Sequence, residues 1–486
     1  MKIILLNLPW IENEDRYGVK SGARWASVRY RDRTLPYFPF PFSLAYTTSL
    51  LKTSGYDALL LDAIAEGKSR KWVYDFIKEQ KPDLIILDTS TPSIYSDLEF
   101  SGIVKRMLNI PIALCGPHAS ALPNECIKQD GANFVLIGEM EHTALELVKA
   151  IEVKNRDYHL IDGLAYWDKR GIKVNKRREL ISDLDSLPYP ERESLRIERY
   201  TDPTCKRYPN ISIISSRGCP HHCIYCLEPS VFYGKANYRV RKPSMVVDEI
   251  EYLIKQFHVR EIYFDDSSFT TSIKHARDIS QEIIDRGISV YWSCMADART
   301  DKDTLLLMKK SGCHGVKFGV ESADEEILKS IKKPLDLEQV KGFISLCNEI
   351  GLYTHATYMF GLPGETRQSI RKTIDFAFSL GTTTAQFSLA TPYPRTEFYD
   401  YLKKNGFLLT SDYRNFEGGN SSVISYPNLD AKEIESAVLE TRRRKMIALI
   451  KNPLLLVKYL NKLSKIEGWN IVSDIIQKGK FLLKKD

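Results

Sequence analysis

Short apolar runs alternate along most of this chain with longer amphipathic stretches, and this alternation restricts the possible folds more than any other feature. In the first 150 residues, five runs have the composition of buried strands: 2–8, 57–63, 83–90, 110–117 and 133–139. The stretches between them, such as 43–55 and 70–81, have helical periodicity. Strand and helix in alternation predict an α/β domain with a doubly wound, Rossmann-like parallel sheet and ligands at the carboxyl ends of its strands.

A second series of strand-like runs begins at Ile211 and again alternates with helical patterns. It comprises residues 211–216, 261–267, 289–296, 314–321, 353–361 and 384–392. Six strands are too few to close an eight-stranded ring, so we expect a partial (β/α)6 barrel of the TIM type, open on one side. The expected domains are therefore 1–150, a connector at 151–210 with a hairpin at 163–176, a barrel at 211–405 and a mostly helical region at 406–486.

Composition and charge indicate a globular protein of the cytoplasm. Hydrophobic residues make up 43% of the chain and charged residues 27%. Six of the nine cysteines are scattered singly, which is typical of a reducing compartment, and the apolar run at the N-terminus is too short for a signal sequence or a membrane span. The net charge of +7 is confined to the tail, because residues 441–486 carry +9 and the remainder about −2. This distribution argues against a nucleic-acid-binding surface.

Three of the cysteines, Cys219, Cys223 and Cys226, lie within eight residues, just after the first strand of the second series. Three thiolates on one loop can hold three corners of a four-iron cluster and leave the fourth iron open to a small chelating molecule. A zinc site completed by His221 or His222 is an alternative, although both histidines lie on the short loop between the first two cysteines, which strains tetrahedral closure. A disulfide is disfavoured in a reducing compartment.

This motif resembles the signature of the radical SAM superfamily, C-x-x-x-C-x-x-C with an aromatic residue, here Tyr225, before the last cysteine. The resemblance covers about residues 211–400 and implies a [4Fe-4S] cluster on the three cysteines. It further implies that S-adenosylmethionine (SAM) chelates the open iron, near Tyr225, and is cleaved reductively to a 5′-deoxyadenosyl radical. A reducing partner such as a flavodoxin or ferredoxin would supply the electron.

Other strand ends resemble the SAM-binding segments of that superfamily. The resemblance implies SAM contacts from Asp265 and Asp266 after the second strand, Glu321 at the end of the fourth, and Met359 at the start of a Gly-rich segment after the fifth. Each residue also has an ordinary alternative: the aspartates could cap the next helix, Glu321 could be a surface carboxylate, and the glycines of residues 361–364 could serve only the turn.

The first domain resembles a cobalamin-binding domain. Segments after its third and fourth strands match the places where such domains hold the nucleotide tail of the cofactor, and the segment after its fifth strand resembles the family as well. The implied contacts are Thr89 and Ser90, then Gly116, Pro117 and His118, and finally Gly138 and Glu139. The alternative is a plain doubly wound domain without a ligand.

The histidine that ligates cobalt in many cobalamin domains, within a D-x-H-x-x-G motif after the first strand, is absent. The chain reads Asn-Leu-Pro-Trp there, at residues 7–10, and the similar residues 62–67, with Ile64 in the histidine position, follow the second strand instead. His118 follows the fourth strand, too far away to reach cobalt. The resemblance therefore implies that cobalamin binds with neither its own base nor a protein histidine on cobalt, as in the radical SAM members of the family.

Three segments outside these motifs are rich in basic residues. Residues 10–42 form a long aromatic and basic insertion, which could cover a ligand or pack at the interface between two domains. Residues 452–465 and 470–485 have amphipathic helical patterns with lysines on one side. They could pack under the open barrel or make a peripheral contact with the inner face of the membrane.

Together these features predict a cobalamin-dependent radical SAM enzyme that methylates an unactivated carbon of a small-molecule or lipid substrate. An oxidative, cyclising or C–C bond-forming radical reaction of the same architecture is the alternative, and a non-enzymatic cobalamin sensor is a distant one. The last is disfavoured because Cys219, Cys223, Cys226 and Glu321 are all intact.

Overall fold

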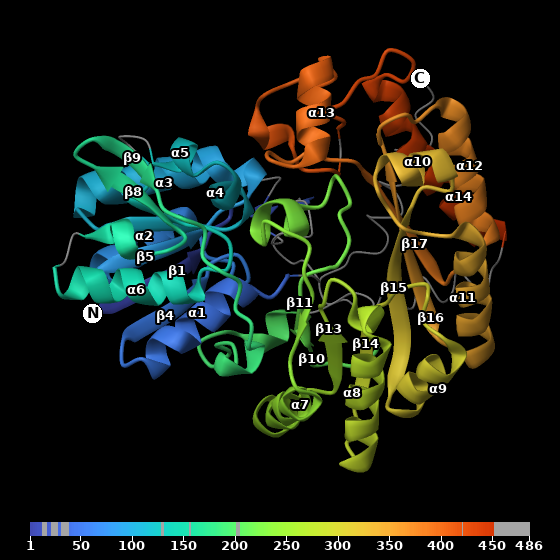
Figure 1. The fold of residues 1–486 in the computed structure, drawn as a ribbon, viewed down its shortest axis with the longest axis horizontal. Coiled ribbons are helices and arrows are strands. Elements are labelled where there is room, and N and C mark those ends of the chain that lie inside the picture. The colour runs from blue at the N-terminus through green and yellow to red at the C-terminus, as the bar shows by residue number, and fades with distance from the viewer. Residues whose placement is uncertain are drawn as a thin grey trace.

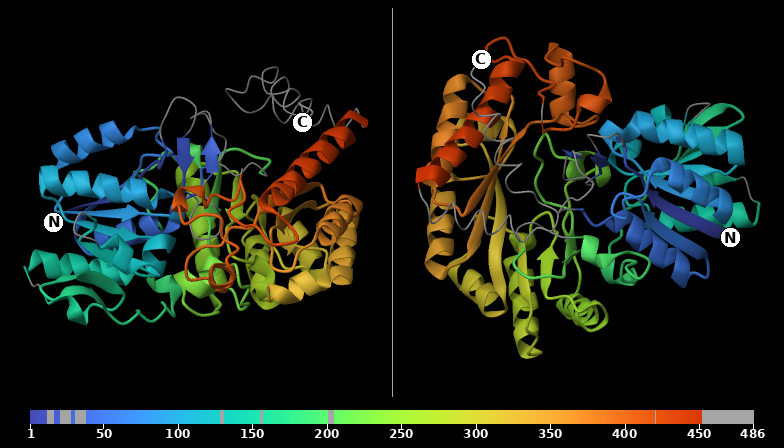
Figure 2. Two further views of the ribbon diagram at one scale, coloured as in Figure 1. Left: turned by 90° about the horizontal axis from the view of Figure 1, so that it is seen from above. Right: turned by 180° about the vertical axis from the view of Figure 1, so that it is seen from behind.

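Two parallel sheets with helices around them form the body of the protein. The computed structural model describes residues 1–11, 17–20, 28–30, 38–127, 131–154, 157–200, 205–419 and 421–451. The sheets lie side by side, and the segment around β11 runs between them (Figures 1 and 2). This arrangement confirms the predicted α/β fold class.

The N-terminal sheet has the strand order β4-β1-β5-β6-β7-β8-β9. Its strands are β1 (Lys2–Asn7), β4 (Asp57–Asp62), β5 (Leu84–Asp88), β6 (Ile112–Cys115), β7 (Phe134–Leu136), β8 (Leu164–Asp168) and β9 (Gly171–Val174). The first five are mutually parallel and coincide with the five predicted runs. The order reverses between β1 and β5, and such switch points are where doubly wound sheets bind ligands.

Helices cover both faces of this sheet because its strands are apolar on both sides. Ile3 and Leu5 of β1 belong to one core cluster, and Ile4 and Leu6 belong to another. The first cluster includes residues of α1 (Phe42–Thr53) and α6 (Glu141–Glu152). The second includes residues of α2 (Arg70–Gln80), α3 (Ile94–Leu108), α4 (Pro117–Ala121) and α5 (Pro123–Cys126).

The predicted hairpin of the connector is present as β8 and β9, and it joins the N-terminal sheet. β8 pairs antiparallel with β7, and β9 pairs antiparallel with β8. The sheet therefore continues past residue 150. The expected domain limits remain predictions.

The second sheet consists of six parallel strands in chain order. These are β10 (Asn210–Ile213), β13 (Glu261–Phe264), β14 (Tyr291–Met295), β15 (Cys313–Glu321), β16 (Tyr353–Phe360) and β17 (Thr384–Leu389). In the described parts of the chain β10 and β17 are the edge strands, as expected for an open (β/α)6 barrel. The surrounding helices are α7 (Pro243–Phe257), α8 (Ile273–Asp285), α9 (Lys302–Lys310), α10 (Glu325–Ser330), α11 (Leu337–Ile350) and α12 (Arg367–Ser379).

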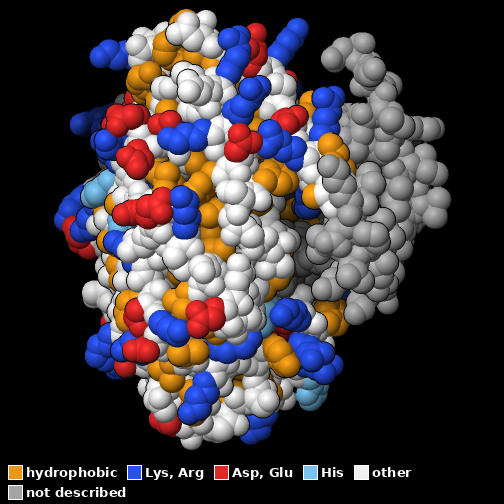
Figure 3. All heavy atoms as spheres, turned by 90° about the vertical axis from the view of Figure 1, so that its right-hand side faces the viewer, with side chains coloured by type: hydrophobic (Ala, Val, Ile, Leu, Met, Phe, Trp, Pro, Cys, Tyr) orange, Lys and Arg blue, Asp and Glu red, His pale blue; other side chains and the backbone are white. Residues whose placement is uncertain are grey.

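The outer face of this half is charged in both signs. Lys and Arg side chains are interspersed with Asp and Glu over the face that Figure 3 shows. Such a surface is what the solvent-facing sides of amphipathic helices produce.

The C-terminal region is helical only in part. It contains α13 (Glu397–Asn405), the short helix η7 (Tyr413–Asn415) and α14 (Ala431–Lys451), whose Ile434 and Val438 pack with Phe360 and Leu389 of the barrel. Residues 406–419 and 421–430 are otherwise loop, because their Gly, Asn, Ser and Pro favour turns. The two predicted tail helices, 452–465 and 470–485, lie outside the described residues.

Two small antiparallel sheets complete the described structure: β2 (Tyr17–Val19) with β3 (Val28–Tyr30), and β11 (Ser216–Arg217) with β12 (Arg239–Val240). The first belongs to the insertion at 10–42, of which large parts lie outside the described residues. Among the residues that are described, no helix is long and apolar enough to cross a membrane.

Candidate active site between the two sheets

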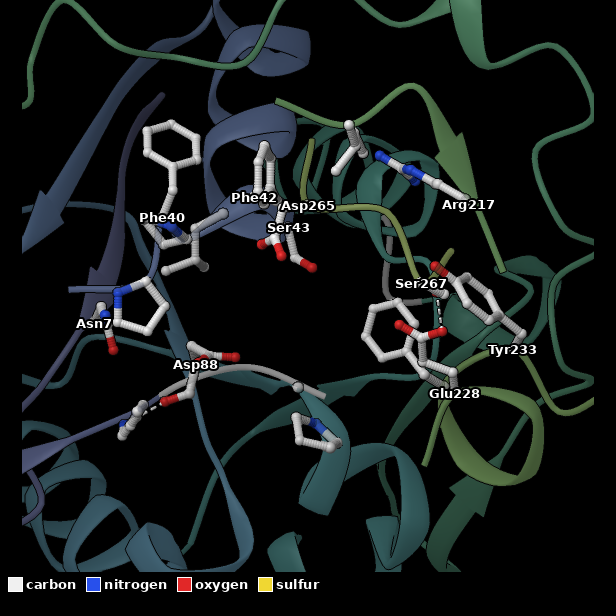
Figure 4. A pocket seen from close by; sticks show the side chains of 18 of the residues that line it. Asn7, Phe40, Phe42, Ser43, Asp88, Arg217, Glu228, Tyr233, Asp265 and Ser267 are labelled. Carbon is white, nitrogen blue, oxygen red and sulfur yellow. Dashed lines mark hydrogen bonds between the residues drawn. The ribbon is translucent and has the colours of Figure 1, made fainter. Parts of the chain in front are cut away.

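A cavity that is partly open to solvent lies where the carboxyl ends of the two sheets face each other. Asn7 and Asp88 reach it from the switch point of the N-terminal sheet. Glu228, Asp265 and Ser267 reach it from the barrel (Figure 4). Phenylalanine, tyrosine and proline residues line much of the remaining wall, which combines apolar surface with a few polar groups, as binding sites do.

The cysteine loop begins directly after β11. Gly218 has a φ of +91°, and a Cβ there would lie 2.3 Å from Asn237 Oδ1, so glycine is required. The loop is attached to the barrel, because the backbone N–H of Ile224 donates to the carbonyl of Ile331 at 3.2 Å and the Cys223 thiol lies 3.8 Å from the carbonyl of Lys332. The backbone thus presents the cysteines at the end of the sheet.

The three thiols are close enough to influence one another. Burial is the main cause that raises the pKa of Cys219 to about 11 and the pKa of Cys226 well above its usual value. The other two cysteines contribute to the raised pKa of Cys226. As free thiols they are neutral, and binding iron would release their protons. Their chemistry fits an iron–sulfur cluster.

The alternative zinc site is not formed within the described residues. No group of three or more Cys, His, Asp or Glu side chains there could hold a single metal ion. His221 Nε2 instead lies 3.1 Å from the guanidinium of Arg299, and His222 is exposed. A four-iron cluster attaches each cysteine to a different iron, so its ligands need not converge on one point.

Glu321 ends β15 in an unfavourable backbone conformation. Its φ is +66°, and the register with β16 shifts between Gly319 and Glu321. Such strain costs about 1–3 kcal/mol and is concentrated at functional sites. The Lys333 ammonium pairs with Glu321 Oε1 at 3.0 Å, and Glu321 is only 7% exposed. Glu321 is therefore not a free surface carboxylate.

Lys333 is a site residue that the sequence analysis missed. Although burial opposes its charge, Glu321, Cys223 and Cys219 raise the pKa of its ammonium. It lies in the loop after α10, twelve positions from Glu321, and no motif marks it in the sequence. Only the docking of this loop against the cysteine loop brings its positive charge between a carboxylate and the thiols.

The two predicted aspartates have different surroundings. Asp265 lines the cavity (Figure 4). Asp266 is 1% exposed, and its Oδ1 accepts hydrogen bonds from the backbone N–H and hydroxyl groups of Ser215 and Ser216. Asp266 thus fixes the approach to β11. Neither residue caps the next helix, whose N-cap is Ser272.

The remaining predicted SAM contacts, Tyr225 and Met359, both lie partly buried against one apolar cluster that includes Ile224 and Phe360. Tyr225 also lies beside the cysteines. Burial is the main cause that raises the pKa of its phenol, and Glu321, Cys223 and Cys226 raise that pKa further. In the turn that follows β16, Glu365 Oε2 accepts the backbone N–H groups of Gly361 and Leu362 at 2.6 and 3.0 Å.

Glu365 should make stability depend on pH. Burial raises its pKa to about 8, so between about pH 4.5 and 8 the folded protein keeps a proton that the unfolded chain has released. The unfolding free energy should therefore fall as pH rises through this window, by about 1.4 kcal/mol per unit from this group. Glu365→Gln should remove that slope in urea titrations, whereas the exposed Glu326→Gln should not. Parallel slopes for wild type and Glu365→Gln would contradict this account.

Of the predicted cobalamin contacts after β5 and β6, Gly116 and Pro117 line the cavity, and Thr89, Ser90 and His118 do not. Gly116 lines the cavity with a φ of +94°, and a Cβ there would lie 2.4 Å from the carbonyl of Thr89. Pro117 lines the cavity as well, and Ser90 caps the short helix η1 (Thr91–Ser93). Beside them the Lys20 ammonium pairs with Asp97 at 2.9 Å, which ties the insertion to α3.

His118 is fully buried after β6. Its Nδ1 lies 3.3 Å from Thr91 Oγ1, its ring contacts Tyr413 edge-on at 4.9 Å, and burial lowers its pKa to about 3. Its Nε2 has no hydrogen-bond partner among the residues that the structure describes. A buried unsatisfied nitrogen is costly, so this loop fits a polar ligand such as the cofactor's tail.

The two predicted cobalamin contacts in the loop after β7, Gly138 and Glu139, lie against other residues of the protein. Gly138 has a φ of +75°, and a Cβ there would lie 2.9 Å from Arg177 Nη2. The Glu139 carboxylate accepts hydrogen bonds from Arg217, Arg239 and the backbone N–H of Ile181. Neither residue lines the cavity.

Comparison with known proteins places these features in a family. Residues 213–377 match the radical SAM superfamily model. An uncharacterised methyltransferase of Pyrococcus horikoshii is 31% identical over 77% of this chain and 81% of its own length. An anaerobic magnesium-protoporphyrin IX monomethyl ester cyclase of Rubrivivax gelatinosus is 29% identical over 83% of this chain and 73% of its own.

The fold also matches a solved enzyme along most of its length. The radical SAM methyltransferase TsrM of Kitasatospora setae, with tryptophan and a SAM analogue bound, superposes with a TM-score of 0.67 at 22% identity, covering 85% of this chain and 78% of that one. A second structure of TsrM, with cobalamin and a [4Fe-4S] cluster bound, gives a TM-score of 0.65.

Proposed function

This chain belongs to the radical SAM superfamily, in the class with a cobalamin-binding domain, and from that premise we propose that it methylates an unactivated carbon of a small molecule. The observation that carries the proposal is the shared cavity. Its walls combine Asp88 and Gly116 of the N-terminal sheet with Glu228 and Asp265 of the barrel. A substrate there would lie between the two sets of loops.

The residues of the chain would bind and orient the cofactors and substrate. Cys219, Cys223 and Cys226 would hold the cluster, while Glu321, Lys333 and Asp265 would fix the polar groups of SAM. When bound, the cluster and SAM supply a radical that removes hydrogen, and cobalamin supplies the methyl group. The aromatic wall would exclude water from the substrate.

The remaining assignments concern the cobalamin side. Thr89, Ser90, Gly116, Pro117 and His118 would contact that cofactor, and the buried, neutral His118 would hydrogen-bond to it through Nε2. This role leaves the metal itself without a protein histidine.

Isotope labelling tests the methyl transfer. Reconstituted protein, a chemical reductant and SAM with a deuterated methyl group are incubated anaerobically with an extract of a deletion strain. A metabolite that gains the labelled methyl group supports the proposal. SAM cleavage with no label beyond SAM and cobalamin would contradict it.

The cyclase relative gives the second candidate a specific basis. At 29% identity over most of the chain, a cyclising reaction without methyl transfer fits the same cavity. In that case the substrate would lose hydrogen, and the product would contain no labelled methyl group from SAM. The same labelling experiment therefore separates methylation from cyclisation.

Cobalamin should bind without a nitrogen ligand on cobalt. Residues 8–11, which follow β1, contain no histidine, and His118 lies in α4, after β6. The cob(II)alamin form should therefore give an electron paramagnetic resonance signal without nitrogen superhyperfine splitting, unlike free base-on cob(II)alamin. Nitrogen splitting, or failure to take up any corrinoid, would contradict this prediction.

A lipid or membrane-soluble pigment as substrate, with a peripheral membrane contact, is the narrower form of the proposal. It rests on the net charge of +9 in residues 441–486. Co-sedimentation with anionic liposomes tests it by comparing the full chain with a chain ending at residue 450. Equal pelleting of both would contradict it. A flavodoxin or ferredoxin as reductant remains part of the same proposal.

A further inference from the structure

Four buried charged side chains connect the N-terminal sheet to the two ends of the cysteine loop. Glu139 and Glu141 follow β7, Arg217 ends β11, and Arg239 begins β12. Their side chains are 3%, 2%, 7% and 13% exposed, respectively. Charges are seldom buried so deeply without a specific partner arrangement.

The contacts converge on one carboxylate. Glu139 Oε1 lies 3.1 Å from Arg217 Nη1, and both Glu139 oxygens lie within 2.9 Å of Arg239 Nη1. Arg217 Nη2 also pairs with Glu141 Oε1 at 2.8 Å. The guanidinium groups are held further by rings, since Arg217 lies over Tyr46 at 4.9 Å and Arg239 over Tyr233 at 5.2 Å.

The pairing of β11 with β12 shows what these four charged residues hold in place. Arg217 and Arg239 are direct partners across β11 and β12, so together they close the loop 218–238. That loop contains Cys219, Cys223 and Cys226. One carboxylate of the N-terminal sheet therefore holds both ends of the segment that would bear the cluster.

Glu139 has little capacity left for another ligand. Its Oε1 accepts from Arg217 and Arg239, and its Oε2 accepts from Arg239 and from the backbone N–H of Ile181 at 2.9 Å. Each carboxylate oxygen thus already has two donors, which is the usual limit.

We propose that Glu139 and Glu141 are positioning residues that fix the cysteine loop relative to the N-terminal sheet, and that Glu139 does not contact cobalamin. The inference rests on the proposed function, because it assigns the cluster to this loop and cobalamin to that sheet. Through Arg217 and Arg239, the two carboxylates would set the distance between the cofactors.

Glu139→Gln tests the proposal, since it keeps the shape of the side chain and removes its charge. The matched control is Glu146→Gln, which removes a more exposed carboxylate of the helix that follows, α6, whose partner is Arg178. Each reconstituted protein is measured for cobalamin affinity by absorption titration, for the cluster's midpoint potential, and for the dipolar interaction between cob(II)alamin and the reduced cluster by electron paramagnetic resonance.

In Glu139→Gln we expect cobalamin affinity within twofold of wild type, a less negative cluster potential and an altered dipolar interaction. The potential should rise because the unbalanced positive charge of Arg217 and Arg239 favours the more negative reduced cluster. Glu146→Gln should match wild type in all three. If Glu139→Gln does not fold, Arg239→Gln is measured in the same way; it should also alter the dipolar interaction.

Two results would overturn the proposal. One is loss of cobalamin affinity in Glu139→Gln with the potential and dipolar interaction unchanged, which would make Glu139 a cofactor ligand. The other is no change in any readout. Failure of the underlying function would be distinguishable, because wild-type protein would then take up no cluster or no corrinoid.

Discussion

Replacing Cys219, Cys223 or Cys226 with Ala is expected to abolish both the iron–sulfur cluster and SAM cleavage. With three protein ligands there is no spare thiolate, since the other cysteines in the described residues are distant in sequence and mostly buried in the two cores. Iron and sulfide content, the absorption of the reconstituted protein and 5′-deoxyadenosine formation measure the effect.

Cys347→Ala is the matched control. Cys347 is buried in the barrel core, away from the cysteine loop, so its replacement should lower stability modestly and leave cluster content unchanged. Full SAM cleavage in any of the three loop variants, or zinc in place of iron in the wild type, would refute the assignment.

Glu321→Ala is expected to weaken SAM binding about 10- to 100-fold, the effect of losing one hydrogen bond to a charged group. The side chain ends β15 beside the Lys333 ammonium, and its strained φ of +66° has no evident structural purpose. Binding of SAM to the reconstituted protein, followed by the change in the cluster's electron paramagnetic resonance signal, measures the loss.

Glu321→Gly separates binding from folding. Glycine adopts a positive φ without strain, so this variant should lose SAM affinity as Glu321→Ala does while melting at a higher temperature than Glu321→Ala, since both variants remove the partner of the Lys333 ammonium equally. Retention of normal affinity in Glu321→Gly would show that the carboxylate is a structural partner of Lys333 and does not bind SAM.

The sequence alone was sufficient to predict the strands of the two sheets. Five buried runs in the N-terminal half and six in the barrel could be recognised because continuous apolar runs separated by amphipathic helices have few other solutions. The cysteine motif could be recognised for a similar reason, since three ligands that lie close in sequence also lie close in space. The spacing of the cysteines thus indicated a metal cluster, and the resemblance of the motifs to known families implied the radical SAM family and its cofactors.

Only the tertiary structure decided what depends on contacts between distant segments. Asp265 and Asp266 are equivalent in the sequence, yet one lines the cavity and the other holds Ser215 and Ser216. Lys333 has no motif, and it reaches Glu321 because two loops dock. Glu139 resembles a cofactor contact in the sequence, but the fold places it between Arg217 and Arg239. The physical reason is that a buried charge takes its role from its partners, and those partners are chosen by the packing of separate elements.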